Sequence, residues 1–284
     1  MRFTVLGSGG NSPIPMPTCD CHICTEAREK GEPYARRGNS VFVHDENILI
    51  DTPELIWYSL NRESISTVDS IFITHFHADH THGLRALQSI GGEQPPMSTF
   101  VGDVPTLYMS TVTYERAIKA SEFFELLTDQ WADIELLDEN ETISLGNLDV
   151  THIVAPEFED GANVISGFLF ESGNQTAFVS PDETRHFDLT QLPDLDLWVK
   201  ECGYFSETPE GESLVTDTAE QGILQHELTF QKSLDQIRTV TPERVVLTEL
   251  EEFYRRSYDD YQHLEERYDN LNLEFAYDGM NIEI

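Results

Sequence analysis

Three histidines and an aspartate lie within one short stretch of the chain, and their types and spacing are those of metal ligands. Their order is His75-x-His77-x-Asp79-His80, directly after an apolar run, residues 70–74, that predicts a buried strand. An extended segment sends the first two histidines to one side, and a following turn can aim the aspartate and the third histidine at a neighbouring point. This pattern predicts two adjacent metal positions, with ions about 3.5–4 Å apart and a water between them. A solvated turn is the alternative, but four of the ten histidines fall between positions 75 and 82. We do not assign His82 as a ligand.

A second group of metal-ligand types is Cys19-x-Cys21-x-x-Cys24. In an intracellular chain, clustered cysteines are more often metal ligands or redox groups than structural disulfides. Thiolates at this spacing can face one tetrahedral zinc ion, at a Zn–S distance of about 2.3 Å. A helix predicted to begin near Thr25 would place its N-terminus beside them and favour the thiolate forms. Three unliganded thiols are the alternative, and a closed zinc site needs a fourth ligand.

The elements that must position these residues are strands that recur along the whole chain. Predicted strands cover residues 2–6, 40–43, 47–50, 70–74, 149–157, 167–171, 176–179 and 244–249. The second and third form a hairpin with its turn at residues 45 and 46. Helices are predicted over 113–127, for packing or as a wall of a substrate cleft, and over 221–237. No Pro/Ser-rich or Gly/Ser-rich linker divides the chain, which predicts a single domain, residues 1–284, with a core of normal size.

The histidine loop resembles the signature of the metallo-β-lactamase fold, a large group of metal-dependent hydrolases. The resemblance implies an α/β protein, an αββα sandwich of two mixed β-sheets flanked by helices. Residues 6–12, the cysteine cluster and the Arg-Gly-Asn-Ser segment at 37–40 are similar to the N-terminal region of the PhnP-type phosphodiesterases. In that group the cysteines bind a structural zinc away from the catalytic pair of ions. A cofactor-biosynthesis relative carries a similar cluster, so the cluster does not fix the substrate.

The resemblance also implies the remaining ligands, at the ends of later strands. It places Glu157 where the family has its third histidine, whereas His152 comes five residues too early. Asp182, one residue from strict register, would bridge both ions, and Glu249 replaces the histidine of the family's Leu-Thr-His strand end. One ion would be held by His75, His77 and Glu157, and the other by Asp79, His80 and Glu249. Two glutamates in place of histidines favour Mn²⁺ or Fe²⁺ as well as Zn²⁺. Both glutamates can also be ordinary surface acids, in which case the site is decayed and holds one metal or none.

Other residues would support this site by the same resemblance. Asp51, at the end of the hairpin, would support the histidine loop, with a strand-end cap as the alternative. His226 has the spacing of the group's general-acid histidine and would protonate the leaving oxygen. A structural histidine on a helix face is the alternative. Glu252, where the group has a histidine, would complete the cysteine site, with His22 or Cys202 as poorer candidates.

The charge of the chain is unusual, since 52 acidic residues stand against 17 basic ones, for a net charge of −35. Disorder is disfavoured because 39% of the residues are hydrophobic and 10% aromatic. We infer a halophile, because self-repulsion is tolerable where the Debye length is only about 3 Å, as at 1 M salt. The charge argues against an extended nucleic-acid surface but not against a small anionic substrate. No apolar stretch of about 18 residues and no signal segment is present, so we expect a soluble, cytoplasmic protein that does not bind membranes.

Together these features predict a metal-dependent hydrolase of phosphodiesters. The expected substrate is a small cyclic phosphate or nucleotide-like ester, and Asp79 would both bind metal and orient the attacking water. The expected cofactors are two divalent ions, Zn or Mn/Fe, in the active site and one structural Zn at the cysteine cluster. The alternatives are a hydrolase of the same fold that acts on another ester, thioester or lactone, and a non-catalytic metal-binding protein. The oligomeric state stays open, a homodimer included.

Overall fold

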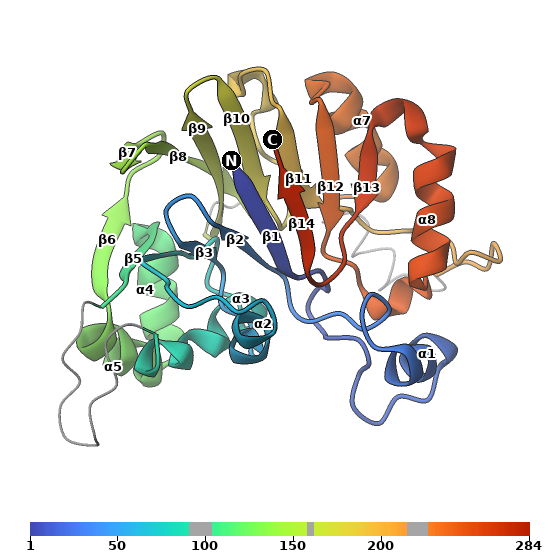
Figure 1. Ribbon diagram of the computed structural model, residues 1–284, viewed down its shortest axis with the longest axis horizontal. Helices are drawn as coiled ribbons and strands as arrows, with labels where there is room; N and C mark the ends of the chain where they lie inside the picture. Colours follow the sequence, from blue (N-terminus) through green and yellow to red (C-terminus); the bar gives the residue numbers. More distant parts are fainter. Residues whose placement is uncertain (91–103, 158–161, 215–226) are drawn as a thin grey trace.

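The computed structural model describes residues 1–90, 104–157, 162–214 and 227–284. Within these residues two seven-stranded sheets lie face to face, and helices cover their outer faces (Figure 1). Both sheets are mixed. The structure is therefore the αββα sandwich that the family resemblance of the histidine loop implies.

The first sheet has the strand order β14-β1-β2-β3-β4-β5-β6. Its strands are β1 (Arg2–Gly7), β2 (Ser40–Val43), β3 (Ile48–Ile50), β4 (Ser70–Phe72), β5 (Thr106–Ser110), β6 (Asp133–Leu137) and β14 (Met280–Glu283). The pairs from β14 to β3 are antiparallel, and those from β3 to β6 are parallel. Strands from the beginning and the end of the described chain thus pair directly, with Arg2 opposite Glu283.

The second sheet repeats this pattern in the order β13-β12-β11-β10-β9-β8-β7. Its strands are β7 (Thr142–Leu145), β8 (Leu148–Pro156), β9 (Val164–Ser172), β10 (Gln175–Ser180), β11 (Leu197–Glu201), β12 (Arg244–Thr248) and β13 (Leu273–Phe275). The pairs from β7 to β10 are antiparallel, and those from β10 to β13 are parallel. Consequently β8, β10, β11 and β12 all run in one direction, and the residues that follow them meet at one edge of the sheet.

The packing of the core explains why many strands have continuous apolar sequences instead of alternating apolar and polar residues. In β3, Ile48 and Ile50 face the space between the sheets, where Phe168 and Phe170 of β9 pack. The intervening Leu49 faces outward, against the helical layer. Because both faces of each sheet are covered, both sets of side chains must be apolar.

The helices form the outer layers. They are α1 (His22–Lys30), α2 (Ile56–Arg62), α3 (Ala78–Thr81), η1 (His82–Gln88), α4 (Thr111–Ala120), α5 (Glu122–Trp131), η2 (Leu189–Gln191), α7 (Phe230–Val240), η3 (Glu252–Tyr254), α8 (Tyr258–Arg267) and η4 (Asp269–Leu271). The side chains of α2, η1, α4 and α5 pack on the first sheet, and those of α7 and α8 on the second. None of the helices in the described ranges is both long and apolar enough to cross a membrane.

Most predicted strands are confirmed, and three helix predictions need correction. The single helix predicted over 113–127 is wrong, since α4 and α5 break at Ser121, whose hydroxyl accepts from the backbone N–H of Phe124 and caps α5. The helix after the cysteines begins at His22 instead of Thr25, because Cys21 caps it. In the predicted helix 221–237, residues 221–226 lie outside the described part, and α7 begins at Phe230.

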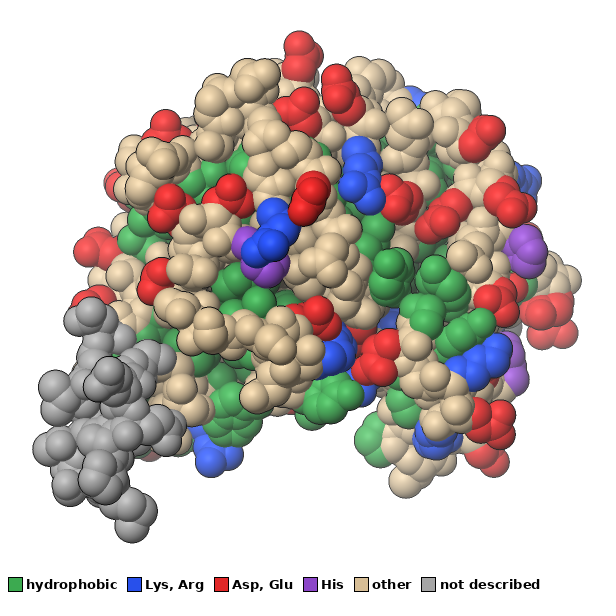
Figure 2. Space-filling model, in the orientation of Figure 1, with side chains coloured by type: hydrophobic (Ala, Val, Ile, Leu, Met, Phe, Trp, Pro, Cys, Tyr) green, Lys and Arg blue, Asp and Glu red, His purple; other side chains and the backbone are tan. Residues whose placement is uncertain are grey.

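Acidic side chains are spread widely over the face of the molecule shown in Figure 2, as the composition requires. Lysine and arginine side chains are isolated among them. We see no continuous basic surface on this face.

Candidate functional site

The predicted ligands come from the ends of strands in both sheets and meet at one edge of the sandwich. The histidine loop follows β4, and Asp51 follows the parallel neighbour β3. From the second sheet, Glu157 follows β8, Asp182 lies two residues after β10, and Glu249 follows β12. Parallel strands place their carboxyl ends at one edge, so the strand order itself brings these residues together.

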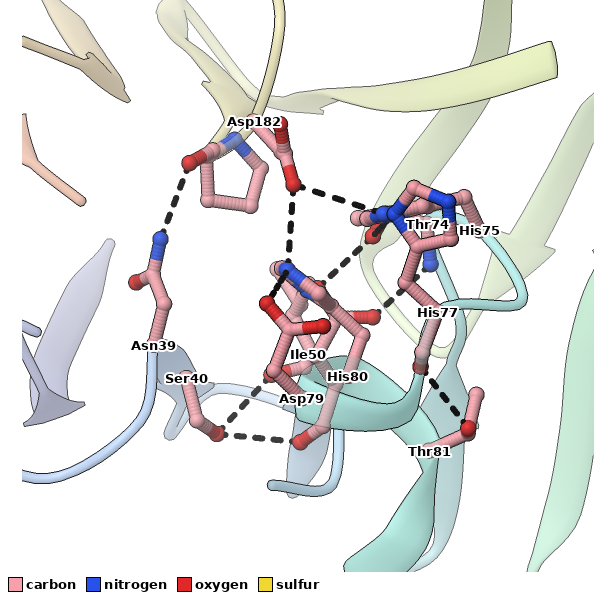
Figure 3. Close-up of polar contacts among 12 residues, drawn as sticks. Asn39, Ser40, Ile50, Thr74, His75, His77, Asp79, His80, Thr81 and Asp182 are labelled. Atoms are coloured by element: carbon pink, nitrogen blue, oxygen red, sulfur yellow. Dashed lines mark hydrogen bonds and ion pairs between the residues drawn. The ribbon is translucent and has the colours of Figure 1, made fainter. Parts of the chain in front are cut away.

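Asp182, from the second sheet, contacts the histidines that follow a strand of the first sheet. Its carboxylate points between two imidazoles (Figure 3), with Oδ2 3.0 Å from Nε2 of His80 and 3.4 Å from Nε2 of His75. Oδ2 of Asp79 lies 3.4 Å from the same Nε2 of His80. This central position is the one that a bridging carboxylate requires.

Two groups of potential ligand atoms are compact enough to hold one ion each. One consists of His75, His80 and Asp182, and the other of Asp79, His80 and Glu249, with all ligand atoms of a group within 4.8 Å of one another. His77 and Glu157 form a separate pair, with Nε2 3.5 Å from Oε1. The predicted set is therefore gathered in one place, but His75 groups with His80 and Asp182 instead of with His77 and Glu157.

The buried imidazole nitrogens fit a metal. Nε2 of His75 and Nε2 of His80 are buried, and neither makes a hydrogen bond of normal geometry to the described residues. A buried polar atom without such a bond is costly. A divalent cation bound to these nitrogens and to the surrounding carboxylates would remove that cost, and the donor set of imidazoles and carboxylates suits Zn²⁺, Mn²⁺ or Fe²⁺.

The electrostatics of the site prepare two of these groups as ligands. Burial, and then the charge of neighbouring His80, lowers the pKa of His75 to about 3, so its imidazole is neutral at pH 7. Burial opposes ionisation of Asp182, but the adjacent histidines outweigh it and hold the pKa of Asp182 below its usual value. A neutral imidazole and an ionised carboxylate are the states that bind a metal.

Asp51 fixes the orientation of the histidine loop. This fully buried carboxylate accepts from the backbone N–H of Thr74, from the Thr74 hydroxyl and from Nδ1 of His80, each at 2.8 Å. In the neutral form that binds a metal, a hydrogen on Nδ1 leaves the lone pair of His80 on Nε2, which faces the other ligands. The supporting role that the sequence suggests for Asp51 is thus matched by its contacts.

Asn39 is a site residue to which the sequence analysis gave no role. Its Nδ2 donates to Oε2 of Glu249 at 2.6 Å and to the carbonyl of Pro181 at 2.9 Å, while its Oδ1 accepts from Thr248. It therefore ties the two strand ends that carry Glu249 and Asp182. The signal was the Arg-Gly-Asn-Ser segment at 37–40, which contributed only to the resemblance.

A cavity of about 340 Å³ opens over these ligands. Around it stand further carboxylates that the sequence analysis missed, because nothing local marks them: Glu183, Glu201, Glu227 and Glu251. Burial is the main cause that raises the pKa of Glu183 and of Glu201 to about 8. Among the described residues that line the cavity there is no lysine or arginine. Any positive charge from this lining would have to come from protonated histidine.

His226 and His152, which the sequence analysis also considered, have different outcomes. His226, the predicted general acid, lies outside the described residues. His152 is buried in β8, where Nδ1 bonds the carbonyl of Asp138 and Nε2 bonds the Ser166 hydroxyl. It lies within the strand, before the strand end where the ligands gather, which agrees with its exclusion from the ligand set.

The three clustered cysteines meet Glu252 from the far end of the chain. The Sγ atoms of Cys21, Cys19 and Cys24 lie 2.9, 3.7 and 3.9 Å from Oε1 of Glu252. All four ligand atoms lie within 4.8 Å of one another, a group that includes neither His22 nor Cys202. Burial, and then the Glu252 carboxylate, raises the pKa of Cys21 to about 12. The sequence analysis expected the helix N-terminus to favour the thiolate form of these cysteines. For Cys21, the helix N-terminus alone does not keep the thiol deprotonated.

Comparisons with known proteins agree with this geometry. A model of the β-lactamase superfamily domain matches residues 46–248. A 93-residue segment is 32% identical to an octanoyltransferase of Porphyromonas gingivalis, over 32% of this chain and 18% of that protein. Because the chain spans so little of that protein, the match carries no statement about activity.

Several solved structures are similar over the whole chain. They include Zn²⁺-bound PqqB from Methylobacterium extorquens (16% identity, TM-score 0.76, 100% of both chains). A diphosphatase of the PhnP family has 23% identity and a TM-score of 0.72, over 100% of this chain and 97% of that one. Human tRNase Z, short form, has 17% identity and a TM-score of 0.63, over 100% and 99%. At these identities the likeness shows the fold.

Proposed function

Since the chain belongs to the β-lactamase superfamily, we propose that it is a metal-dependent phosphodiesterase that acts on small substrates. The observation that carries this proposal is that two overlapping groups of ligand atoms adjoin each other at one cavity. His80 belongs both to the group with His75 and Asp182 and to the group with Asp79 and Glu249. The one free lone pair of His80, on Nε2, can bind a single ion, so a second ion would rely on the other ligands of these groups. A pair of ions held in this way would suit the hydrolysis of phosphate esters.

The chain's own residues would prepare this centre for the reaction. When bound, two divalent ions supply an acidified water and neutralise charge on the phosphoryl group. Asp182 reaches from the second sheet to His75 and His80, and Asp51 keeps the lone pair of His80 directed inward. Asp79 lines the cavity beside His80, where it can orient a water as well as bind metal. His226 remains our candidate for the general acid.

Two further points support a phosphodiester over other esters. Among the similar structures are a diphosphatase of the PhnP family and a tRNase Z, by their names proteins that act on phosphate esters or anhydrides. The cavity of about 340 Å³ suits a small molecule better than a long polymer. The proposed substrate is therefore a cyclic phosphate or a nucleotide-like diester.

Protein loaded with Mn²⁺ or Zn²⁺ at molar salt is expected to hydrolyse bis(4-nitrophenyl) phosphate, because the paired ions act on any accessible diester. The measurement is nitrophenolate release, with 4-nitrophenyl acetate, a thioester, a lactone and a β-lactam tested in parallel. Chelator treatment provides the control and should abolish turnover. Folded, metal-loaded protein without activity on any phosphodiester would contradict the proposal, and turnover of another ester alone would identify a different hydrolase.

We also propose a structural zinc at Cys19, Cys21, Cys24 and Glu252. Three sulfur ligands and one carboxylate oxygen complete a four-coordinate, closed site. The backbone around it is already organised, since the amide of Met16 donates to the sulfur of Cys24 and that of Cys24 to the sulfur of Cys21. Such a zinc would connect α1 with the segment after β12.

Replacing Cys21 by alanine is expected to remove one zinc per chain and to lower the free energy of unfolding by about 3 kcal/mol or more. Bound zinc contributes this much when the free zinc concentration exceeds the dissociation constant 100-fold, and the variant loses that contribution. Glu252→His should keep the zinc, since imidazole is an equally good ligand. Mass spectrometry of bound metal and denaturant unfolding provide the measurement. Glu266→Gln, on the exposed face of α8, is the control. An unchanged zinc content in Cys21→Ala would show that the thiols are unliganded.

A further inference from the structure

A second cavity adjoins the candidate metal centre. It has a volume of about 240 Å³ and lies between the segment that follows β4 and the helices α4 and α5. His77 and Ala78 line both this cavity and the one over the metal ligands. The two spaces therefore adjoin each other at these two residues.

The lining of the second cavity is mainly apolar, in contrast to the first. Its apolar walls include Phe76, Leu84, Ala117, Ala120, Phe124 and Leu127. Phe123, which also lines the cavity, keeps 49% of its surface exposed. A mainly apolar cavity of this kind is a usual place for a ligand to bind.

The first cavity cannot supply much binding energy for a phosphodiester by itself. Its described lining contains eight carboxylates and no lysine or arginine, so no lysine or arginine of this lining would help the ions to hold an anionic ester. At about 30 Å³ for a water-sized group, the second cavity has room for about eight such groups, enough for a phenyl ring or a six-carbon chain. Burial of apolar surface there would provide the missing affinity.

We propose that the cavity between α4, α5 and the histidine loop is a subsite for an apolar substituent of the substrate. The substrate class is then an amphiphilic phosphodiester, with its phosphoryl group at the metal ligands and an alkyl or aryl ester group past His77. This inference rests on the proposed phosphodiesterase function and adds its specificity.

The test uses diesters that share one leaving group, methyl, hexyl and phenyl 4-nitrophenyl phosphate, on the full-length, metal-loaded protein. We expect kcat/KM for the hexyl and phenyl esters to exceed that for the methyl ester by about 30-fold or more, since an apolar substituent is buried only in the longer substrates. Equal values for all three esters would overturn the subsite while leaving the phosphodiesterase function intact.

Variants at exposed lining positions localise the effect without disturbing the core. Ala120→Trp fills the cavity and should reduce the preference to within about threefold. Leu126→Ser removes an apolar side chain that is 50% exposed on the neighbouring helix α5 but does not line the cavity, and it should keep the preference. A preference that survives Ala120→Trp would place the apolar group elsewhere and refute the assignment.

If no diester is hydrolysed, the proposed function fails, and binding still tests the subsite. Calorimetry would compare hexylphosphonate with methylphosphonate on the metal-loaded protein. Tighter binding of the hexyl compound that Ala120→Trp abolishes would support an apolar subsite, and equal binding would refute it.

Discussion

Replacing Asp182 by alanine is expected to reduce phosphodiester hydrolysis about 1,000-fold or more and to lower the metal content of the catalytic centre. The carboxylate lies within 3.4 Å of both His75 Nε2 and His80 Nε2, and it belongs to one of the two ligand groups. Its removal takes away one ligand of that group and a carboxylate that faces both imidazole nitrogens. Loss of one electrostatic group at a reacting centre alone costs about 100- to 1,000-fold, and loss of metal adds to this. Initial rates and metal per chain by mass spectrometry provide the measurements.

The same variant separates an active centre from a decayed one. In a decayed site Asp182→Ala would change neither metal content nor activity. The zinc at the cysteine cluster should stay in either case, because Glu252 and the cysteines form a separate group of ligand atoms. Asp194→Asn, at an exposed position, is the matched control and should behave like the unaltered protein.

Replacing Asp51 by alanine is expected to produce the largest loss of stability, about 3–5 kcal/mol. The carboxylate is fully buried and accepts three hydrogen bonds at 2.8 Å, from two donors of Thr74 and from Nδ1 of His80. Alanine leaves these donors buried without a partner, which carries the full cost of their desolvation. Asp51 also has a φ of 59°, a left-handed conformation that alanine tolerates less well than aspartate or asparagine. Guanidinium unfolding of the metal-free variant provides the measurement.

Asp51→Asn tests the cause of this loss. Asparagine tolerates the left-handed backbone and keeps one oxygen acceptor, so it should cost less than alanine in stability. It should still weaken metal binding about 10- to 100-fold, since the partner of Nδ1 of His80 is altered. Asp45→Ala removes an exposed carboxylate from the hairpin turn and should cost no more than about 1 kcal/mol. A loss of under about 1 kcal/mol in Asp51→Ala would mean that Asp51 is only a strand-end cap.

The sequence could predict those parts of the site that depend on neighbours along the chain. The histidine loop is a local pattern after an apolar run, and its structure follows directly from β4 and the turn into α3. Glu249 and Asp182 were predicted through the family resemblance, which places ligands at the ends of these strands, and the structure brings both to the histidine loop. The one-residue offset of Asp182 is accommodated by Pro181, which lies between it and the end of β10.

Other parts depend on contacts between distant segments, which no local pattern reveals. Asn39 reaches Glu249 only because β2 and β12 belong to sheets that face each other. The carboxylates Glu183 and Glu201 look like ordinary acids in so acidic a chain, and only the order of β10 and β11 places them beside the metal ligands. The break at Ser121 had a local signal, since serine before an acidic residue is a common helix start. The long apolar pattern over residues 113–127 resembled a single helix, so this signal was overlooked.

The direct pairing of the first and last strands has a consequence for the order of folding. β1 pairs with β14, and Cys19 contacts Glu252 at a sequence separation of 233 residues. A nascent chain on the ribosome cannot close either metal site until the segment around residues 249–252 has emerged. Contacts of such high sequence separation also slow folding, because a long loop must be closed before any of them forms. Metal capture is therefore a late event, and an ion that is held with all its ligands marks a chain whose synthesis has passed β12.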